Sequence, residues 1–154
     1  MYNAIFLDID GVINNVNTKS SDNPYLSIDS GLVQKLAEIV ESTNAKIFLI
    51  SNWKSFWEKD DKEFQHEIAN YIDYKLSCES LEIEDKVEGE DLTRGANIKH
   101  FLLTHDIKNF VILDDLAFDY KKIGFSKNFV QTTMQYGLTD EDVIKAIRIL
   151  NKNK

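Results

Sequence analysis

Two aspartates separated by a single residue follow a short apolar segment near the start of the chain. Residues 5–7 are apolar, Asp8 and Asp10 come directly afterwards, and Gly11 follows. A short apolar run of this kind predicts a buried strand, and a buried carboxylate without a partner is energetically costly. The pair therefore indicates a metal-binding or catalytic site at the end of a strand, where Gly11 supplies the backbone freedom for a turn. A structural role as turn or capping acids is the alternative.

Two further apolar segments, residues 46–50 and 110–113, also end in polar side chains. The polar residues are Ser51 and Asn52 after the first segment and Asp114 and Asp115 after the second. In a parallel sheet the carboxyl ends of the strands share one edge, and ligands bind there. Four carboxylates at that edge would repel one another unless a cation lay among them. Hard oxygen ligands in this number suit Mg²⁺.

Alternating strands and helices are expected to position these side chains. The predicted strands comprise the apolar run that ends at Asp8 and residues 46–50, 81–87, 110–113 and 129–132. The predicted helices begin near Asp29 or Ser30, run from Trp53 to about Lys75, run from Thr93 to about Thr104, and begin at residues 137–139. This alternation predicts a three-layer, Rossmann-like α/β fold with a mostly parallel five-stranded sheet.

Finer predictions concern the second helix, the last helix and one loop. One face of the second predicted helix carries Trp53, Trp57, Phe64, Ile68 and Ile72. Its two tryptophans are four residues apart, which favours a place in the core over a stacking platform for a ligand. Thr139 and Asp142 have the spacing of a capping box at the last helix. The polar residues 14–30, which include Pro24, predict a long loop over the site.

The composition predicts a globular chain with one domain, residues 1–154. Hydrophobic residues make up 43% and charged residues 29% of the 154 residues, which is ordinary for such a domain. Cys78 is the only cysteine and the three histidines lie away from the strand ends, so we expect no disulfide, zinc site or Ser-His-Asp triad. Neither a signal peptide nor an apolar run of about 20 residues is present, so a cytoplasmic location without membrane contact is expected.

The net charge of −8 is concentrated in the middle of the chain. Residues 58–91 contain 13 acidic and 4 basic residues, whereas the rest of the chain contains 13 acidic and 14 basic residues. The charge therefore does not exclude a phosphate-bearing polymer as a ligand. The acidic segment is predicted to be a solvated surface, and a surface for a basic partner is the alternative.

The polar segments resemble, in their order and context, the four motifs of haloacid-dehalogenase-like (HAD-like) hydrolases. The matching features are the Asp-Ile-Asp-Gly-Val sequence at residues 8–12, Ser51 after an apolar strand, a basic residue at a helix start, and Val-Ile-Leu-Asp-Asp at residues 111–115. The resemblance covers nearly the whole chain. Residues 51–54, 94–98 and 137–139 are also similar to the HAD domain of Swiss army knife RNA-repair proteins, although that branch usually has Ser and Arg at the positions of Asn52 and Lys54.

The resemblance implies catalytic roles for several residues. Asp8 would be the nucleophile that forms an aspartyl-phosphate. Asp10 would first be the general acid for the leaving oxygen and then the general base for the attacking water. Ser51 would bind a phosphoryl oxygen, and Arg94 would offset the charge of the transferring group. Lys99, which lies one turn further along the same predicted helix, is the alternative basic residue.

The resemblance also implies a metal site and a substrate site. Asp8, the main-chain carbonyl of Asp10, and Asp114 would hold Mg²⁺, with Asp115 as a further ligand or as a neighbour of the ligands. Which of Asp114 and Asp115 binds the metal directly stays open. The substrate-binding residues would be Ser51, Asn52, Lys54 and Lys99.

The segments between the motifs are too short to hold a sizeable cap domain, so we expect a capless protein with an open site. By the resemblance, an open site suits a bulky phosphate ester, such as a nucleotide or the end of a nucleic acid. The predicted function is a Mg²⁺-dependent phosphomonoesterase that acts through an aspartyl-phosphate. The alternatives are a non-catalytic module that binds Mg²⁺, a phosphorylated ligand or a protein partner, and a phosphotransferase that shares the first half-reaction. The sequence does not indicate the oligomeric state.

Overall fold

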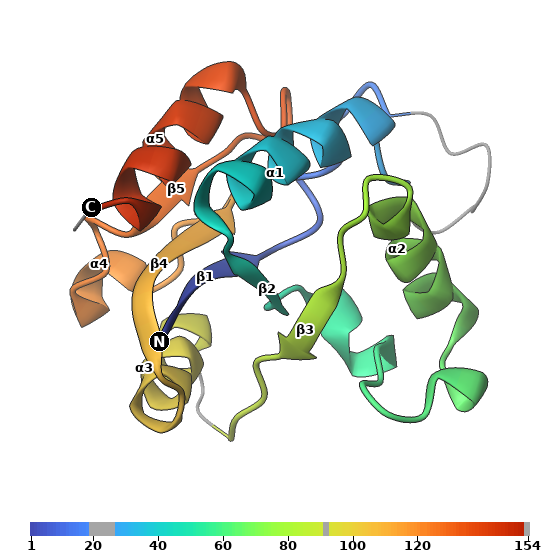
Figure 1. Ribbon diagram of the computed structural model, residues 1–154, viewed down its shortest axis with the longest axis horizontal. Helices are drawn as coiled ribbons and strands as arrows, with labels where there is room; N and C mark the ends of the chain where they lie inside the picture. Colours follow the sequence, from blue (N-terminus) through green and yellow to red (C-terminus); the bar gives the residue numbers. More distant parts are fainter. Residues whose placement is uncertain (19–26, 91–92, 153–154) are drawn as a thin grey trace.

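A five-stranded, fully parallel sheet forms the centre of the structure (Figure 1). The structure is a computed structural model that describes residues 1–18, 27–90 and 93–152. The strands are β1 (Tyr2–Leu7), β2 (Lys46–Leu49), β3 (Ile83–Lys86), β4 (Ile107–Asp114) and β5 (Phe129–Gln131), in the spatial order β3-β2-β1-β4-β5. The predicted α/β fold is confirmed, and β3 lies at one edge of the sheet. β4 begins three residues earlier than predicted.

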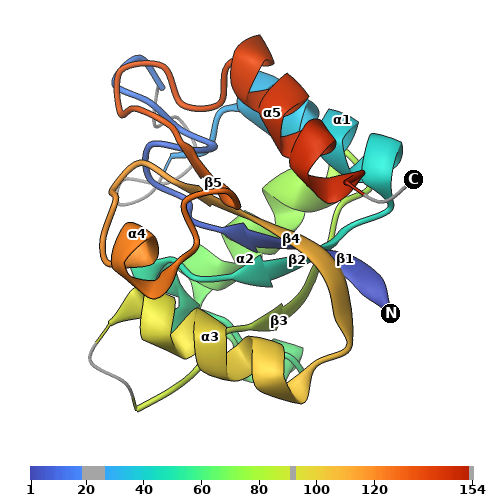
Figure 2. The ribbon, with the colours of Figure 1, turned by 90° about the vertical axis from the view of Figure 1, so that its left-hand side faces the viewer.

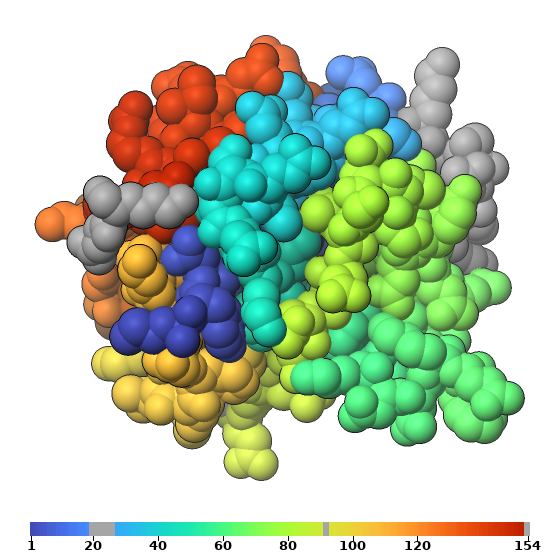
Figure 3. All heavy atoms as spheres, viewed as in Figure 1, coloured from blue at the N-terminus to red at the C-terminus, as the bar shows by residue number. Residues whose placement is uncertain are grey.

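Helices cover both faces of this sheet and complete the three layers (Figure 2). One face is covered by α1 (Ser30–Thr43), α2 (Glu67–Ser77) and α5 (Asp140–Leu150), and the other by α3 (Arg94–Thr104) and α4 (Tyr120–Ile123). Figure 3 shows α1 and α5 packed side by side over the first face. Two 3₁₀ turns, η1 (Asn52–Phe56) and η2 (Lys62–Phe64), connect β2 to α2.

The central strand β1 shows why the strands are apolar throughout. Its side chains alternate between two hydrophobic clusters, with Ile5 and Leu7 in one and Ala4 and Phe6 in the other. All four side chains are fully buried. A strand that is buried on both faces has no solvated side, so its sequence lacks the apolar–polar alternation of a half-buried strand. The chemistry of the chain is therefore confined to the strand ends and the loops that follow them.

The predicted starts of three helices are confirmed. Asp29 caps α1 and Thr93 caps α3, each by accepting a hydrogen bond from the backbone N–H three residues further on. Thr139 and Asp142 form the predicted capping box at the start of α5. These caps satisfy backbone donors that have no partner within the helix.

The single helix predicted from Trp53 to about Lys75 is wrong, because η1, η2 and α2 occupy this segment. Trp57 is fully buried, whereas Phe64 is 83% exposed, so the apolar residues do not share one face. Polar side chains bind the backbone at the break. Gln65 Oε1 accepts the N–H of Glu58 at 2.8 Å, and the ring of His66 caps α2. Such local bonds compete with a continuous helix, and apolar spacing does not reveal them.

The long loop predicted over the site lies partly outside the described residues, which omit 19–26 and with them Pro24. Where the connections from β1 to α1 and from β2 to α3 are described, they contain turns, η1, η2, α2 and β3. No cap domain occurs in these described parts of the chain. A helix long and apolar enough to cross a bilayer is likewise absent from the described residues.

Candidate active site

Asp8 and Asp114 lie side by side at the carboxyl edge of the sheet. The register pairs Leu7 with Leu113, and the backbone N–H of Asp8 donates to the Leu113 carbonyl at 3.0 Å. Both aspartates are buried, and Asp114 has no exposed surface. One carboxylate oxygen from each of Asp8, Asp114 and Asp115 lies within 4.8 Å of the other two. The parallel pairing of β1 and β4 therefore gathers three acids from two motifs.

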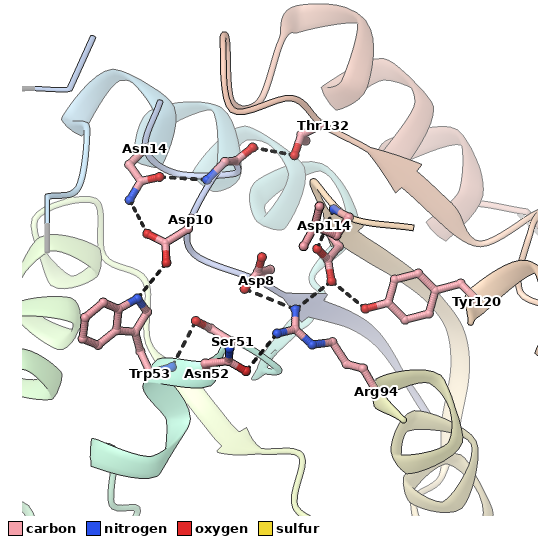
Figure 4. A network of polar contacts seen from close by, with 12 residues as sticks. Asp8, Asp10, Asn14, Ser51, Asn52, Trp53, Arg94, Asp114, Tyr120 and Thr132 are labelled. Carbon is pink, nitrogen blue, oxygen red and sulfur yellow. Dashed lines mark hydrogen bonds and ion pairs between the residues drawn. The ribbon is translucent and has the colours of Figure 1, made fainter. Parts of the chain in front are cut away.

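Arg94, the first residue of α3, contacts this acidic group directly (Figure 4). Its Nη1 atom is 2.8 Å from Asp114 Oδ2 and 3.4 Å from Asp8 Oδ1. Its Nη2 atom donates to Asn52 Oδ1 at 3.2 Å. Tyr120 donates its hydroxyl proton to the same Asp114 oxygen at 2.6 Å. The fully buried carboxylate of Asp114 thus has a cation and a hydroxyl as partners.

One guanidinium does not neutralise three carboxylates, and the raised pKa values of Asp8 and Asp115 reflect this imbalance of charge. Burial and the neighbouring charge of Asp114 raise the pKa of Asp8 to about 7, although Arg94 acts in the opposite direction. Burial and the charge of Asp114 also raise the pKa of Asp115. Burial, together with the adjacent Asp114 carboxylate, raises the pKa of Tyr120. The site therefore holds an excess of negative charge that favours uptake of a proton or of a further cation.

The three carboxylates have the chemistry of a Mg²⁺ site. Hard oxygen ligands suit this ion, and its ligands lie about 2.0–2.1 Å from the metal. Oxygens on opposite sides of one ion are then roughly 4 Å apart, which is close to the spread of the Asp8, Asp114 and Asp115 oxygens. Both oxygens of Asp114 already accept hydrogen bonds from Leu116 N–H, Arg94 and Tyr120. Asp115 is more exposed than either of the other two acids.

The stability of the metal-free protein should depend on the ionisation of Asp8. Because its pKa is about 7 in the folded protein and 3.8 in an ordinary aspartate, the folded state holds this proton more tightly than the unfolded state. The free energy of unfolding should therefore fall as the pH rises from about 4 to about 7. Thermal melts with a chelator at pH 5 and pH 8 measure this trend.

Asp8→Asn is the control for that trend, because an amide does not titrate in this range. The melting temperature of the variant should fall less between pH 5 and pH 8 than that of the wild type. Adding Mg²⁺ at pH 8 should raise the melting temperature of the wild type more than that of the variant, since ligand binding to the folded state stabilises it. An identical response of the two proteins to pH and to Mg²⁺ would contradict both the raised pKa of Asp8 and its place among the Mg²⁺ ligands.

The side chain of Asp10 is held apart from the three gathered acids. Its Oδ2 atom accepts the indole N–H of Trp53 at 2.9 Å, and its Oδ1 atom accepts the Asn14 amide at 2.9 Å. Asp10 is not among the carboxylates that share the 4.8 Å cluster. The side chains of Asp10 and Asp8 therefore have different polar partners and different surroundings.

Gly11 is needed for the turn that places these two aspartates. Its φ of +75° is in the region that favours glycine, and a Cβ there would come within 2.7 Å of the Asp115 side chain. Its N–H donates to Asn14 Oδ1 at 2.8 Å, and its carbonyl accepts the Thr132 hydroxyl at 2.5 Å. Hydrogen bonds at both the N–H and the carbonyl of Gly11 therefore hold the turn in place.

The other predicted residues have different positions relative to this centre. Ser51 is buried at the end of β2, and its hydroxyl accepts the N–H of Trp53 at 3.2 Å. Lys54 is half-buried and lies with Asn52 and Arg94 in the wall of an adjoining hollow. Lys99 is exposed and lines a different hollow. Of the two candidate basic residues, Arg94 is the one that contacts the acids.

Four residues of the site escaped the sequence analysis: Asn14, Trp53, Tyr120 and Thr132. Trp53 was interpreted as core, and its ring does pack against the core while its indole N–H reaches Asp10. Asn14 closely follows the first motif, and this position is the one signal in the sequence that could have identified it. Tyr120 and Thr132 are common residue types without a distinguishing pattern around them.

Comparison with known proteins identifies the family. The sequence profile described as "HAD domain in Swiss Army Knife RNA repair proteins" matches residues 4–143. Neither a search of curated proteins nor a search of solved structures gave a match. The matched range extends from β1 into α5 and includes every residue of the acidic centre and of its polar surroundings. The chain therefore belongs to the family of HAD domains found in Swiss Army Knife RNA repair proteins.

Proposed function

We propose that this HAD-type hydrolase is a Mg²⁺-dependent phosphomonoesterase that forms an aspartyl-phosphate on Asp8. One observation carries the proposal: the buried Asp8 carboxylate lies beside Asp114 and Asp115 and within 3.4 Å of the Arg94 guanidinium. Asp8 and its neighbouring carboxylates repel a phosphate dianion, so cations are needed for the nucleophile to approach the phosphorus. Arg94 is one such cation, and the acids suit a second.

In the first half-reaction an oxygen of Asp8 bonds to phosphorus while the bond to the leaving oxygen breaks. Asp10 gives a proton to that oxygen, which departs as an alcohol. Arg94 and the Ser51 hydroxyl hold the phosphoryl oxygens during transfer. Mg²⁺, held by Asp8, Asp114, Asp115 and the Asp10 carbonyl, would offset the charge of the phosphoryl group when bound.

In the second half-reaction a water molecule attacks the phosphorus of the aspartyl-phosphate. Asp10, now ionised, accepts a proton from this water. Inorganic phosphate leaves and the carboxylate of Asp8 is restored. The same side chain thus works as acid and then as base, which requires that it stay near the reacting oxygens without binding the phosphoryl group itself.

A hollow of about 450 Å³ beside Arg94 supports a nucleotide or polynucleotide phosphate as the substrate. Its wall includes Asn52, Lys54 and Phe118, and Phe118 is 51% exposed. Lys54 Nζ donates to the Val87 carbonyl at 2.7 Å, and within the described ranges it has no carboxylate partner. Burial and the neighbouring charge of Arg94 lower the pKa of Lys54. A half-buried cation beside an exposed ring suits a second phosphate and a base.

Lys54→Met should weaken the binding of a phosphorylated oligonucleotide. We expect KM for that substrate to rise about tenfold more than KM for p-nitrophenyl phosphate, because a charge-assisted hydrogen bond contributes about 1.5–3 kcal/mol. Steady-state kinetics on both substrates measure the difference. Lys59→Met is the matched control, since Lys59 is an exposed lysine that pairs with Asp85. An equal change of KM on both substrates in Lys54→Met would contradict the role.

The function itself is tested with a panel of nucleotides, 3′- and 5′-phosphorylated oligonucleotides and p-nitrophenyl phosphate. The expected result is Mg²⁺-dependent release of phosphate and trapping of the enzyme by beryllium fluoride. Turnover of an oligonucleotide at low concentration should weaken as salt rises, whereas a small ester should be less sensitive. An added alcohol that captures the phosphoryl group in place of water would reveal a phosphotransferase. No turnover and no trapping would indicate a binding module.

A further inference from the structure

The Asp10 carboxylate is held by two donors from different parts of the chain. Trp53, in η1 after β2, donates its indole N–H to Oδ2, and Asn14, in the turn after β1, donates its amide to Oδ1, both at 2.9 Å. Each carboxylate oxygen therefore has one donor. An ionised carboxylate offers about four acceptor positions, so each oxygen keeps a position that can face a reacting group.

The orientation of the Asn14 amide follows from its neighbours. The N–H of Gly11 donates to Asn14 at 2.8 Å, so the carbonyl oxygen of the amide must face Gly11. The NH₂ group then faces Asp10 and the Ser27 carbonyl, and it is 2.9 Å from each. Asn14 is buried, and it ties the carboxylate to the turn that follows Asp8.

The second donor is equally constrained. The ring of Trp53 packs against the hydrophobic core, and its backbone N–H donates to the hydroxyl of Ser51. The indole therefore has little freedom to turn away from Asp10. Figure 4 shows Asp10 between Asn14 and Trp53, on the opposite side of Asp8 from Arg94.

We propose that Trp53 and Asn14 are positioning residues that hold the Asp10 carboxylate for both proton transfers. The inference rests on the proposed function, because it assigns these residues to its acid–base step. The proton moves from Asp10 to the leaving oxygen as the P–O bond breaks, and later from water to Asp10 as the aspartyl-phosphate is hydrolysed. A general acid works only within hydrogen-bond reach of the atom it protonates, and small displacements cost rate.

Trp53→Phe removes the indole donor and keeps an aromatic ring in place. An alkoxide leaving group depends on protonation, whereas p-nitrophenolate departs readily without it. We expect single-turnover phosphoryl transfer to slow about tenfold more for a phosphorylated oligonucleotide or a nucleotide than for p-nitrophenyl phosphate. This is a part of the roughly 10²–10⁴-fold that general acid–base catalysis supplies in full. The aspartyl-phosphate should also accumulate with p-nitrophenyl phosphate, because the attacking water loses its positioned base.

Trp57→Phe is the matched control. Trp57 is four residues further on, and its indole N–H also donates to an aspartate, Asp73, at 2.9 Å. This bond lies outside the acidic centre, so the variant should lower the melting temperature without changing the ratio of the rates on the two substrates. Equal slowing of both substrates by Trp53→Phe, as for a general loss of structure, would overturn the inference.

The contact can also be measured without turnover. The chain contains two tryptophans, and the two Phe variants assign their indole N–H signals in a ¹⁵N-correlated NMR spectrum. Asp10→Ala should move the Trp53 signal and leave the Trp57 signal in place, and an unmoved Trp53 signal would overturn the inference. A wild type that keeps this contact but hydrolyses no phosphate ester would refute the proposed function. The positioning role would then be overturned as well, and only a structural hydrogen bond would remain.

Discussion

Asp8→Asn is expected to abolish phosphate ester hydrolysis and the trapping of the folded protein by beryllium fluoride. The amide oxygen is a poor nucleophile, and loss of the nucleophile in covalent hydrolases lowers kcat by about 10⁴–10⁶-fold. Phosphate release measured over the ester panel gives the size of the loss. Mass spectrometry of rapidly quenched protein should show the phosphorylated Asp8 peptide in the wild type and not in the variant.

The same variant should remain folded, which makes its loss of activity interpretable. Burial raises the pKa of Asp8 to about 7, so a neutral side chain of the same shape suits this position at least as well as a carboxylate. Arg94 keeps its 2.8 Å ion pair with Asp114 when Asp8 is replaced. Turnover by Asp8→Asn at the wild-type rate, in protein purified by the same route, would remove Asp8 from the mechanism.

The sequence could predict which motifs meet because the prediction rested on topology. Asp8 and Asp114 each follow an apolar segment, and parallel strands bring their carboxyl ends to one edge whatever the loops do. The capping box of Thr139 and Asp142 could be predicted as well, because a cap depends on residues three positions apart. These features are local or follow from the pairing of strands, so no side-chain packing had to be known.

The supporting polar contacts could not be predicted in the same way. Trp53 has the spacing of a core residue, and only the 3₁₀ turn of η1 lets one face of the ring pack while its N–H meets Asp10. Tyr120 reaches Asp114 from the short helix α4, whose position depends on the whole loop after β4. Such contacts depend on turn conformations that apolar spacing does not encode.

Replacement of Arg94 by Met should damage both activity and stability. Arg94 and Asp114 form a largely buried ion pair, with 11% and 0% of their side chains exposed. Removing one partner of a buried pair costs about 3–5 kcal/mol, because the other charge stays buried. In phosphoryl transfer an arginine that stabilises the transferring group contributes about 10³–10⁵-fold to kcat, so we expect a loss of at least about 10³-fold. Thermal melts and steady-state kinetics measure the two effects.

Two further variants separate charge from geometry. Arg94→Lys keeps the charge, but one ammonium cannot reproduce the contacts of Nη1 with the carboxylates and of Nη2 with Asn52. We therefore expect it to recover more stability than activity. Lys99→Met removes the other candidate cation, which is exposed and lines a separate hollow, and it should leave kcat within about twofold, as surface substitutions usually do.

Mg²⁺ provides the decisive comparison for Arg94. When Arg94 is replaced, the carboxylates lose their positive partner, and a cation among Asp8, Asp114 and Asp115 would offset part of their negative charge. Mg²⁺ should therefore raise the melting temperature of Arg94→Met more than that of the wild type. Activity should not recover, because the ion restores charge but not the contact with a phosphoryl oxygen. A folded Arg94→Met protein with wild-type kcat would exclude Arg94 from the reaction, and a loss of activity in Lys99→Met would then transfer the role to Lys99. We therefore expect Mg²⁺ to replace part of the stabilising charge of Arg94 but not its contribution to catalysis.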